Sequence, residues 1–230
     1  MKTLGLIGGT TWVSTVDYYK YINQMVAERL GGLNSAQILL YSLNFDELKT
    51  LFEKADWARV AEVLTSIAEN LETAGAEAIV LCSNTIHIAA REIEKRIGIP
   101  LIDVTDAAAR EINDLNLKKV ALLGTRFTMD KDFYPEKLGE FGIETIVPSD
   151  AEREFINRSI FEELGKNVFT EETKRKYLEI IENLRMRGAE GVIFGCTEIP
   201  MLIKAEDCAV PSFDTTVIHA RAAVEYALAD

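Results

Sequence analysis

Cysteine and histidine are scarce in this chain, and their scarcity excludes several classes of protein. The 230 residues include three cysteines (Cys82, Cys196 and Cys208) and two histidines. An odd number of cysteines in a chain of this length does not make the disulfide framework of a small secreted domain. The cysteines and histidines also lack the ligand spacing of a metal site. We therefore expect a protein of a reducing cytoplasm with no metal.

Long apolar runs and excess positive charge are lacking as well. No apolar stretch reaches the roughly 18 residues that a membrane-spanning helix needs. Met1–Thr3 leads directly into apolar Leu4–Ile7, which indicates a first strand rather than a signal peptide. The net charge of −12 argues against nucleic acids and anionic membranes as partners, because both are bound by basic surfaces. Composition, with 48% hydrophobic and 27% charged residues, is that of a soluble globular protein.

What the sequence does contain is an internal repeat. Gly75–Thr85 and Gly188–Glu198 both begin Gly-Ala-Glu, continue through an apolar run and end in small polar residues, at an offset of 113 residues (75 to 188). Leu4–Gly8 matches Val120–Gly124 at a similar offset of 116 (4 to 120). Two similar offsets predict two alike halves. We place the first domain at residues 1–113 plus 208–230 and the second at 114–207.

Superposing the two copies aligns residues with chemical function. Ser83 falls opposite Cys196, and Cys82 falls opposite Gly195. Small polar side chains in symmetry-matched positions suggest one site, approached from both halves.

Short apolar runs alternate with longer amphipathic stretches along the chain. The runs lack polar alternation, which is typical of parallel strands covered on both faces. The pattern predicts an α/β protein with two pseudo-symmetric parallel-sheet βαβ domains and an active site in the cleft between them. The expected strands are 4–7, 38–41, 78–82, 101–102, 120–123, 145–147, 192–194 and 209–213, and the expected helices are 14–30, 57–74, 85–97, 171–187 and 215–229.

Ligands of open parallel sheets bind beyond the carboxyl ends of the strands, where helix-start amides favour anions. Polar residues follow four of the predicted strands in this way. We expect these residues to bind substrate: Thr10, Thr11, Asn84, Thr85, Thr125, Arg126, Thr197 and Glu198.

The thiol of Cys196 is the strongest catalytic candidate. It follows a strand and precedes a helix start, where the pKa of a thiol falls. Neighbouring residues of a strand point to opposite faces, so if Ser83 faces the cleft, Cys82 points into the core. Ser83 can be a helix N-cap or a second proton carrier, and the two roles are compatible. His87, one turn later, is either a proton relay or a residue hydrogen-bonded to the backbone.

Several motifs together resemble the aspartate/glutamate racemase superfamily. They are Gly8-Gly9-Thr10, Ser83-Asn84-Thr85-Ile86-His87, Leu123-Gly124-Thr125-Arg126, Gly195-Cys196-Thr197-Glu198 and Val210-Pro211-Ser212-Phe213-Asp214, in order over nearly the whole chain. The aspartate racemase family is most similar, in particular its L-aspartate/glutamate-specific or broad-specificity amino-acid racemases. The resemblance implies a homodimer that uses no cofactor, with Cys196 and Ser83 exchanging protons on opposite faces of the substrate Cα.

Two departures from that family bear on activity and specificity. Ser83 occupies the slot that usually holds the first catalytic cysteine. Where aspartate racemases carry a side-chain-binding arginine and lysine, this sequence reads Phe52-Glu53-Lys54 and Gly165, with Lys166 one position along. Arg126 or Lys166 is then the candidate replacement, and a wider substrate range is expected.

Two other functions are compatible with a single cleft thiol. One is a lyase similar to arylmalonate decarboxylases, which keep only the second-motif cysteine. The other is a non-catalytic amino-acid-binding relative. The Asn-Thr-Ile-His sequence after Ser83 favours the racemase.

Overall fold

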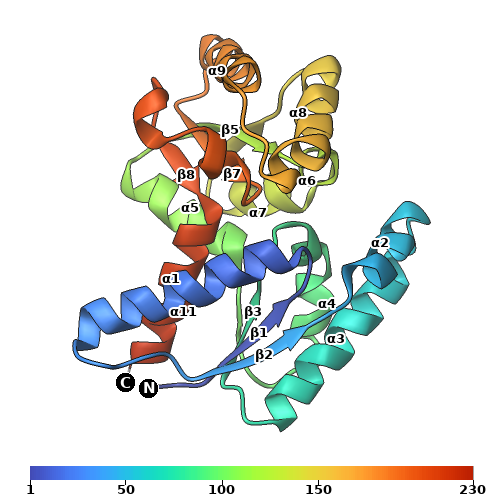
Figure 1. The fold of residues 1–230 in the computed structure, drawn as a ribbon, viewed down its shortest axis with the longest axis vertical. Helices are drawn as coiled ribbons and strands as arrows, with labels where there is room; N and C mark the ends of the chain where they lie inside the picture. The colour runs from blue at the N-terminus through green and yellow to red at the C-terminus, as the bar shows by residue number, and fades with distance from the viewer. Residues whose placement is uncertain (230) are drawn as a thin grey trace. The chain divides into compact units, whose positions relative to one another are not determined.

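The computed structural model describes residues 1–229 and contains two four-stranded sheets, each entirely parallel (Figure 1). The first sheet has the order β2-β1-β3-β4 and the second the order β6-β5-β7-β8. The predicted α/β class is therefore confirmed. The strands are β1 (Leu4–Gly8), β2 (Ile38–Ser42), β3 (Ala78–Leu81), β4 (Leu101–Ile102), β5 (Lys119–Gly124), β6 (Glu144–Ile146), β7 (Gly191–Gly195) and β8 (Ser212–Asp214).

The repeat seen in the sequence is also a repeat of strand register. Ile7 of β1 pairs with Leu81 of β3, and Leu123 of β5 pairs with Phe194 of β7. Adding the offset of 116 residues to Ile7 gives Leu123, and adding the offset of 113 residues to Leu81 gives Phe194. Ser83 and Cys196 each lie two residues beyond the paired residue, so they occupy equivalent places at the carboxyl ends of equivalent strands.

Hydrogen bonds at the other end of these strands repeat too. The Glu77 carboxylate accepts from the backbone N–H of Thr3 at 2.7 Å, and the Glu190 carboxylate accepts from that of the equivalent Lys119 at 3.0 Å. Gly75 and Gly188 precede these acids with φ of 100° and 95°, a conformation that glycine adopts without steric cost. The shared Gly-Ala-Glu thus ends a helix and aligns the next strand.

In the first half, helices cover both faces of the sheet. Leu4, Leu6 and Val80 pack with α1 (Trp12–Leu30) and α11 (Thr215–Leu228). Ile7, Ile79 and Leu81 pack on the other face with α2 (Phe45–Glu53), α3 (Trp57–Thr73) and α4 (Ala90–Glu94). Burial on both faces is why these strands read as continuous apolar runs.

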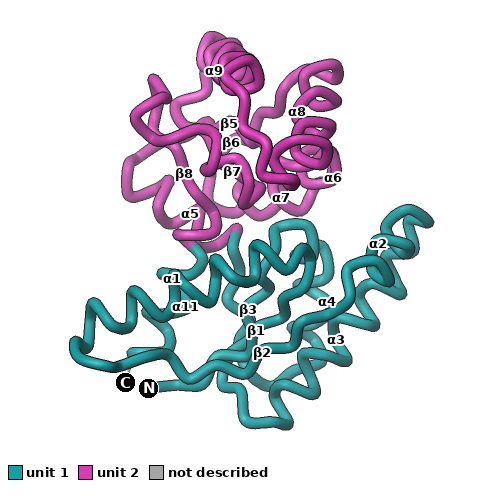
Figure 2. The backbone as a smooth tube through the Cα atoms, viewed as in Figure 1, with its two compact units in different colours: residues 1–104, 219–230 teal, residues 105–218 magenta. Residues whose placement is uncertain are grey.

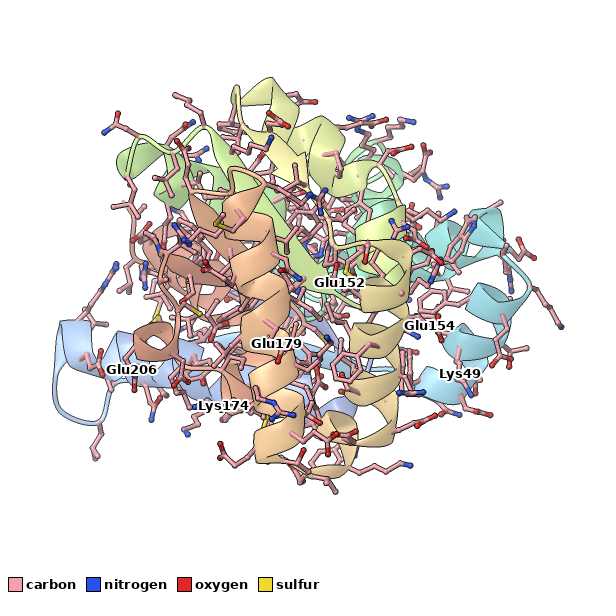
Figure 3. The ribbon with its side chains drawn as sticks, turned by 90° about the horizontal axis from the view of Figure 1, so that it is seen from above. Lys49, Glu152, Glu154, Lys174, Glu179 and Glu206 are labelled. Carbon is pink, nitrogen blue, oxygen red and sulfur yellow. The ribbon has the colours of Figure 1, made fainter. Side chains whose placement is uncertain are left out.

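In the second half, Ala121, Leu123, Val192 and Phe194 pack with helices α8 (Asp150–Glu162), α9 (Glu171–Met186) and α10 (Ile199–Leu202). Helices α8 and α9 lie side by side, with Glu152 and Glu154 on the first and Lys174 and Glu179 on the second (Figure 3). The Asn183 amide of α9 donates to Glu152 at 2.9 Å. The half also contains α5 (Val104–Asp114), α6 (Arg126–Asp130) and α7 (Phe133–Glu140).

The chain forms two compact units (Figure 2). Unit 1 comprises Met1–Val104 and the chain from His219 onward, and unit 2 comprises Thr105–Ile218. The predicted boundaries, 113/114 and 207/208, lie elsewhere. Helix α5 follows β4 but belongs to unit 2, and β8 pairs with β7, which keeps residues 212–214 in the second sheet. The predicted cleft between the halves stays a prediction.

The structure corrects several predicted elements. Helix α1 begins at Trp12 rather than at residue 14, and the Ser14 hydroxyl donates to the Thr11 carbonyl at 3.0 Å. The predicted helix 85–97 is a 3-10 turn, η1 (Thr85–Ala89), followed by the short α4. The last strand is Ser212–Asp214 rather than 209–213. Helices α2, α5, α6, α7 and α8 were not predicted, since each is short or lies next to a turn signal.

Candidate active site

The turn between β1 and α1 forms the first wall of the candidate site in unit 1. Gly9 has φ of 89°, and a Cβ there would lie 2.2 Å from the Leu43 carbonyl oxygen, so only glycine fits. The Gly9 N–H donates to the Thr15 hydroxyl at 2.8 Å. Thr10, predicted to bind substrate, is buried, and its hydroxyl oxygen has no partner among the described residues. Thr11 is half-buried at the start of α1.

Ser83 follows β3, the strand next to β1, and is half-buried. Its backbone N–H donates to the Leu81 carbonyl at 2.8 Å. Asn84, which follows, is 5% exposed, and Thr85 begins η1. Because the carboxyl ends of β1 and β3 are neighbours, the Thr10 and Ser83 segments lie at the same edge of the first sheet.

His87 is hydrogen-bonded to the backbone at both ring nitrogens, which is one of the two roles its sequence position allowed. Nδ1 lies 2.8 Å from the Ser83 carbonyl oxygen, and Nε2 accepts from the backbone N–H of Val104 at 3.3 Å. Burial lowers the pKa of His87, against a smaller opposing effect of the Asp103 carboxylate. The ring is therefore neutral at physiological pH.

Cys82 is a core residue, as its strand register predicted. It is fully buried among Leu6, Val80 and Tyr18, on the α1 face of the sheet. Its Sγ lies 3.9 Å from the Val80 carbonyl, and burial raises the pKa of the thiol. Such a thiol is unreactive.

Cys196 follows β7 in unit 2 and is half-buried. Its Sγ–H donates to the Glu198 carboxylate at 2.9 Å, and the Thr197 hydroxyl donates to the same carboxylate oxygen at 2.8 Å. Glu198 is only 8% exposed. The three predicted residues are thus in direct contact, and together they place a proton acceptor beside the thiol.

The predicted fall in the pKa of the Cys196 thiol is wrong. Burial raises this pKa well above its ordinary value, and the Glu198 carboxylate raises it further. Backbone N–H groups of Thr197 and Glu198 lower the pKa, but by less. The reason lies in the local structure, because α10 has only four residues and begins at Ile199, three positions beyond the thiol. Thiolate formation here needs a base, and Glu198 lies within reach.

The sequence analysis predicts that Glu198 lies at the site but does not predict its hydrogen bond with the Cys196 thiol. Its spacing carried the signal, since a carboxylate two residues beyond a thiol in a turn can reach back to it. His87 carried a similar signal, because a helical residue at position i+4 faces the carbonyl of residue i, here Ser83.

The other predicted substrate-binding residues of unit 2 are Thr125 and two cations, Arg126 and Lys166. Thr125 caps α6 by accepting from the Thr128 N–H. The Arg126 guanidinium binds three carboxylates, those of Asp130, Asp150 and Glu154, and the last of these is labelled on α8 in Figure 3. Lys166 is exposed on a short 3-10 turn, η2 (Leu164–Lys166). Arg126 therefore joins α6 to α8 rather than presenting a free positive charge.

Within residues 1–229, no group of three or more histidine, cysteine, aspartate or glutamate side chains is arranged to hold a metal ion. None of the described helices is both long and apolar enough to cross a membrane.

Comparison with protein families gives the site its context. The model of the Asp/Glu/hydantoin racemase family matches residues 7–223, which include both β-strand ends and all of the polar segments described above. The chain belongs to this racemase family.

Solved structures of similar proteins extend over the whole chain. A Yersinia pestis protein proposed to be an Asp/Glu racemase is 49% identical, with a TM-score of 0.95 and full coverage of both chains. An aspartate racemase homologue from Pyrococcus horikoshii is 39% identical, with a TM-score of 0.87 and 99% coverage of both chains. A broad-specificity amino-acid racemase of Bacillus subtilis is 25% identical over 162 residues, 70% of each chain. The racemase family thus accounts for the two-sheet fold as well as the motifs.

Proposed function

We propose that this chain is a cofactor-independent amino-acid racemase. The observation that carries the proposal is the thiol–carboxylate pair of Cys196 and Glu198 at the end of β7, with Ser83 at the equivalent place beyond β3. Racemisation needs one group to remove the Cα proton and another to return a proton to the opposite face. A duplicated fold offers two such positions, and family membership supports this use of them.

The proposed reaction begins with the resting thiol. Glu198 takes the proton of Cys196, and the resulting thiolate removes the Cα proton of the L-enantiomer. The Cα–H bond breaks, an S–H bond forms, and the electron pair stays on the substrate as a carbanion stabilised by its carboxylate. The Ser83 hydroxyl gives its proton to the opposite face of Cα. Solvent then returns a proton to Ser83 and takes the proton that Glu198 had accepted. The D-enantiomer results, and all groups recover their starting protonation.

Fixed donors stabilise the negative charge in this scheme. The backbone N–H groups at Asn84–Thr85 and at Cys196–Thr197 lie at the carboxyl ends of central strands, where anions bind in parallel α/β folds. The Thr10 hydroxyl, which has no protein partner among the described residues, is a further donor for the substrate carboxylate. Donors of this kind act without reorganising during the reaction.

The substrate class follows from the charges near the site. Arg126 is neutralised by three carboxylates, and Lys166 lies exposed on η2. Without a free guanidinium among these candidates, a side-chain carboxylate has little advantage over a neutral side chain. We therefore propose a range of L-amino acids wider than aspartate and glutamate.

The test is exchange of the Cα proton in heavy water, measured by NMR on a panel of L-amino acids without added cofactor. We expect deuterium at Cα together with formation of the D-enantiomer, and no loss of activity after treatment with EDTA or hydroxylamine. Release of carbon dioxide from an arylmalonate without Cα exchange would replace the racemase with the lyase. Binding without either reaction would leave only an amino-acid-binding protein.

A further inference from the structure

The two histidines of the chain lie together in unit 1 and form a network with a buried tyrosine. The rings of His87 and His219 meet edge to face with centroids 5.3 Å apart. Tyr18 of α1 meets His219 in the same manner at 5.4 Å. His219 is fully buried and is the first residue of α11 that belongs to unit 1. The proposed proton transfers use none of these three side chains.

Hydrogen bonds to carbonyl groups fix the proton positions on both rings. A carbonyl oxygen only accepts, so Nδ1 of His87 carries the hydrogen that it donates to Ser83, and its Nε2 accepts from Val104. In the same way, Nε2 of His219 donates to the Ile102 carbonyl at 2.6 Å. Its Nδ1 then accepts from the Tyr18 hydroxyl at 2.8 Å. Each ring is neutral, in one defined tautomer.

This network ends on the backbone of Ser83. The Ser83 carbonyl is held by His87, and its N–H is held by the Leu81 carbonyl. Both peptide groups that flank the Ser83 Cα therefore have fixed partners. The network also binds the backbone at Ile102 and Val104, just before the chain leaves unit 1, and it includes His219, where the chain returns to that unit.

We propose that His87 is a positioning residue that holds the Ser83 hydroxyl in place for proton delivery, with His219 and Tyr18 fixing the His87 ring from behind. This inference rests on the proposed racemase activity. It replaces a proton-relay role for His87, because both of its ring nitrogens are bound to the backbone.

The measurement that isolates Ser83 is a ratio obtained in heavy water. When Cys196 deprotonates L-substrate, its thiol exchanges the abstracted proton with heavy water. The carbanion then either regains a deuteron on the same face or receives one from the Ser83 side. The first outcome gives deuterated L-substrate and the second gives D-product. A misplaced Ser83 hydroxyl raises the ratio of deuterated L-substrate to D-product, whereas a general loss of folded protein lowers both without changing their ratio.

The variants separate the two bonds of His87. Glutamine places its amide near the position of Nε2, so His87→Gln loses the bond to Ser83, and the ratio should rise about tenfold. Asparagine places its amide near Nδ1, so His87→Asn should bring the ratio back toward the wild-type value. Tyr18→Phe should raise the ratio by a smaller factor. Tyr226→Phe is the matched control, since it removes a hydroxyl of α11 that donates to the distant Glu77 carbonyl at 3.0 Å.

Nitrogen NMR of the two histidines gives a second reading that needs no substrate. We expect the Nδ1–H tautomer for His87 and the Nε2–H tautomer for His219, with the second disturbed in Tyr18→Phe. If wild-type protein exchanges Cα protons but His87→Gln and Tyr18→Phe leave the ratio unchanged, the positioning role is overturned and the racemase remains. If wild-type protein exchanges no Cα proton of any amino acid, the proposed function itself fails.

Discussion

The two units of this protein share a scaffold and differ in the chemistry attached to it. Their sheets have equivalent strand orders, and their central strands pair in the same register. Beyond those strands, unit 1 has the hydroxyl of Ser83, a residue whose backbone carbonyl is bound by a neutral histidine. Unit 2 has a thiol that is hydrogen-bonded to a carboxylate. A duplication thus preserves where a side chain is placed while leaving its acid–base character free to change.

This difference suits the two units to different acid–base roles. A thiol next to a carboxylate can become a thiolate when the carboxylate takes its proton, whereas a serine hydroxyl is a much weaker acid. Cys196 is therefore suited to removing a proton and Ser83 to delivering one.

The largest effect should follow removal of the thiol. Cys196→Ala removes the group that takes the Cα proton of the L-enantiomer, so racemisation should fall by at least about 1,000-fold. Cys82→Ala is the matched control, since it removes the fully buried thiol at the neighbouring position of unit 1. Polarimetry with both enantiomers measures the rates, and circular dichroism verifies folding. Equal inactivity of the two folded variants would contradict the register that separates Cys82 from Ser83.

Register is also where sequence and structure agree best. The positions of the strands before β8, the repeat and the burial of Cys82 could be predicted, because apolar runs and the alternation of side chains along a strand are local properties of the chain. The pKa of Cys196 could not, because it depends on a turn of only two residues between the thiol and α10 and on the reach of the Glu198 side chain. The ion pairs of Arg126 join helices α6 and α8, a contact that no local pattern of the chain indicates.

The second prediction removes the base beside the thiol. Glu198→Gln keeps the size of the side chain but cannot accept the Cys196 proton, so turnover near neutral pH should fall about 100-fold. The variant also loses the carboxylate charge that raises the thiol pKa. Burial still holds the thiol pKa above its ordinary value, so the rate of the variant should keep rising with pH above neutrality, as hydroxide removes the thiol proton.

The pH–rate profiles of wild type and Glu198→Gln measure this difference. Glu206→Gln, which changes an exposed carboxylate of unit 2, serves as the control and should match wild type. A Glu198→Gln enzyme with the wild-type rate and profile would show that the carboxylate does not take the thiol proton.

The third prediction makes the two units more alike. Ser83→Cys places thiols at both equivalent positions, and a thiol forms its anion far more readily than a hydroxyl does. The kcat for conversion of D- to L-substrate should rise about tenfold relative to the opposite direction. The equilibrium constant stays at one, so kcat/KM remains equal in both directions and KM changes with kcat. An unchanged ratio of the two kcat values would leave Ser83 with a structural role alone.

The smallest effect concerns the pH dependence of stability, which should differ between the two units because only one of them contains histidine. Both histidines of the chain belong to unit 1. Burial, followed by the charge of His87, lowers the pKa of His219 to about 3, and burial lowers that of His87 as well. In the unfolded chain a histidine titrates near its ordinary value of about 6.5, so below that pH the unfolded state binds protons that the folded state does not. Stability is therefore complete above about pH 6.5 and declines as pH falls toward 3.

For His219 alone the loss between neutral pH and about pH 5.5 is roughly 1.4 kcal/mol. Urea unfolding combined with amide hydrogen exchange can locate it. Protection of β1 and β3 in unit 1 should weaken over this pH range, while that of β5 and β7 in unit 2 stays nearly constant. Equal losses of protection in both units would mean that the buried histidines do not govern the loss of stability in acid. Carboxylates, which both units contain, would then be its cause. A loss confined to unit 1 would show that the copy that presents Ser83 is held in place by neutral imidazoles, and that acid weakens this copy first.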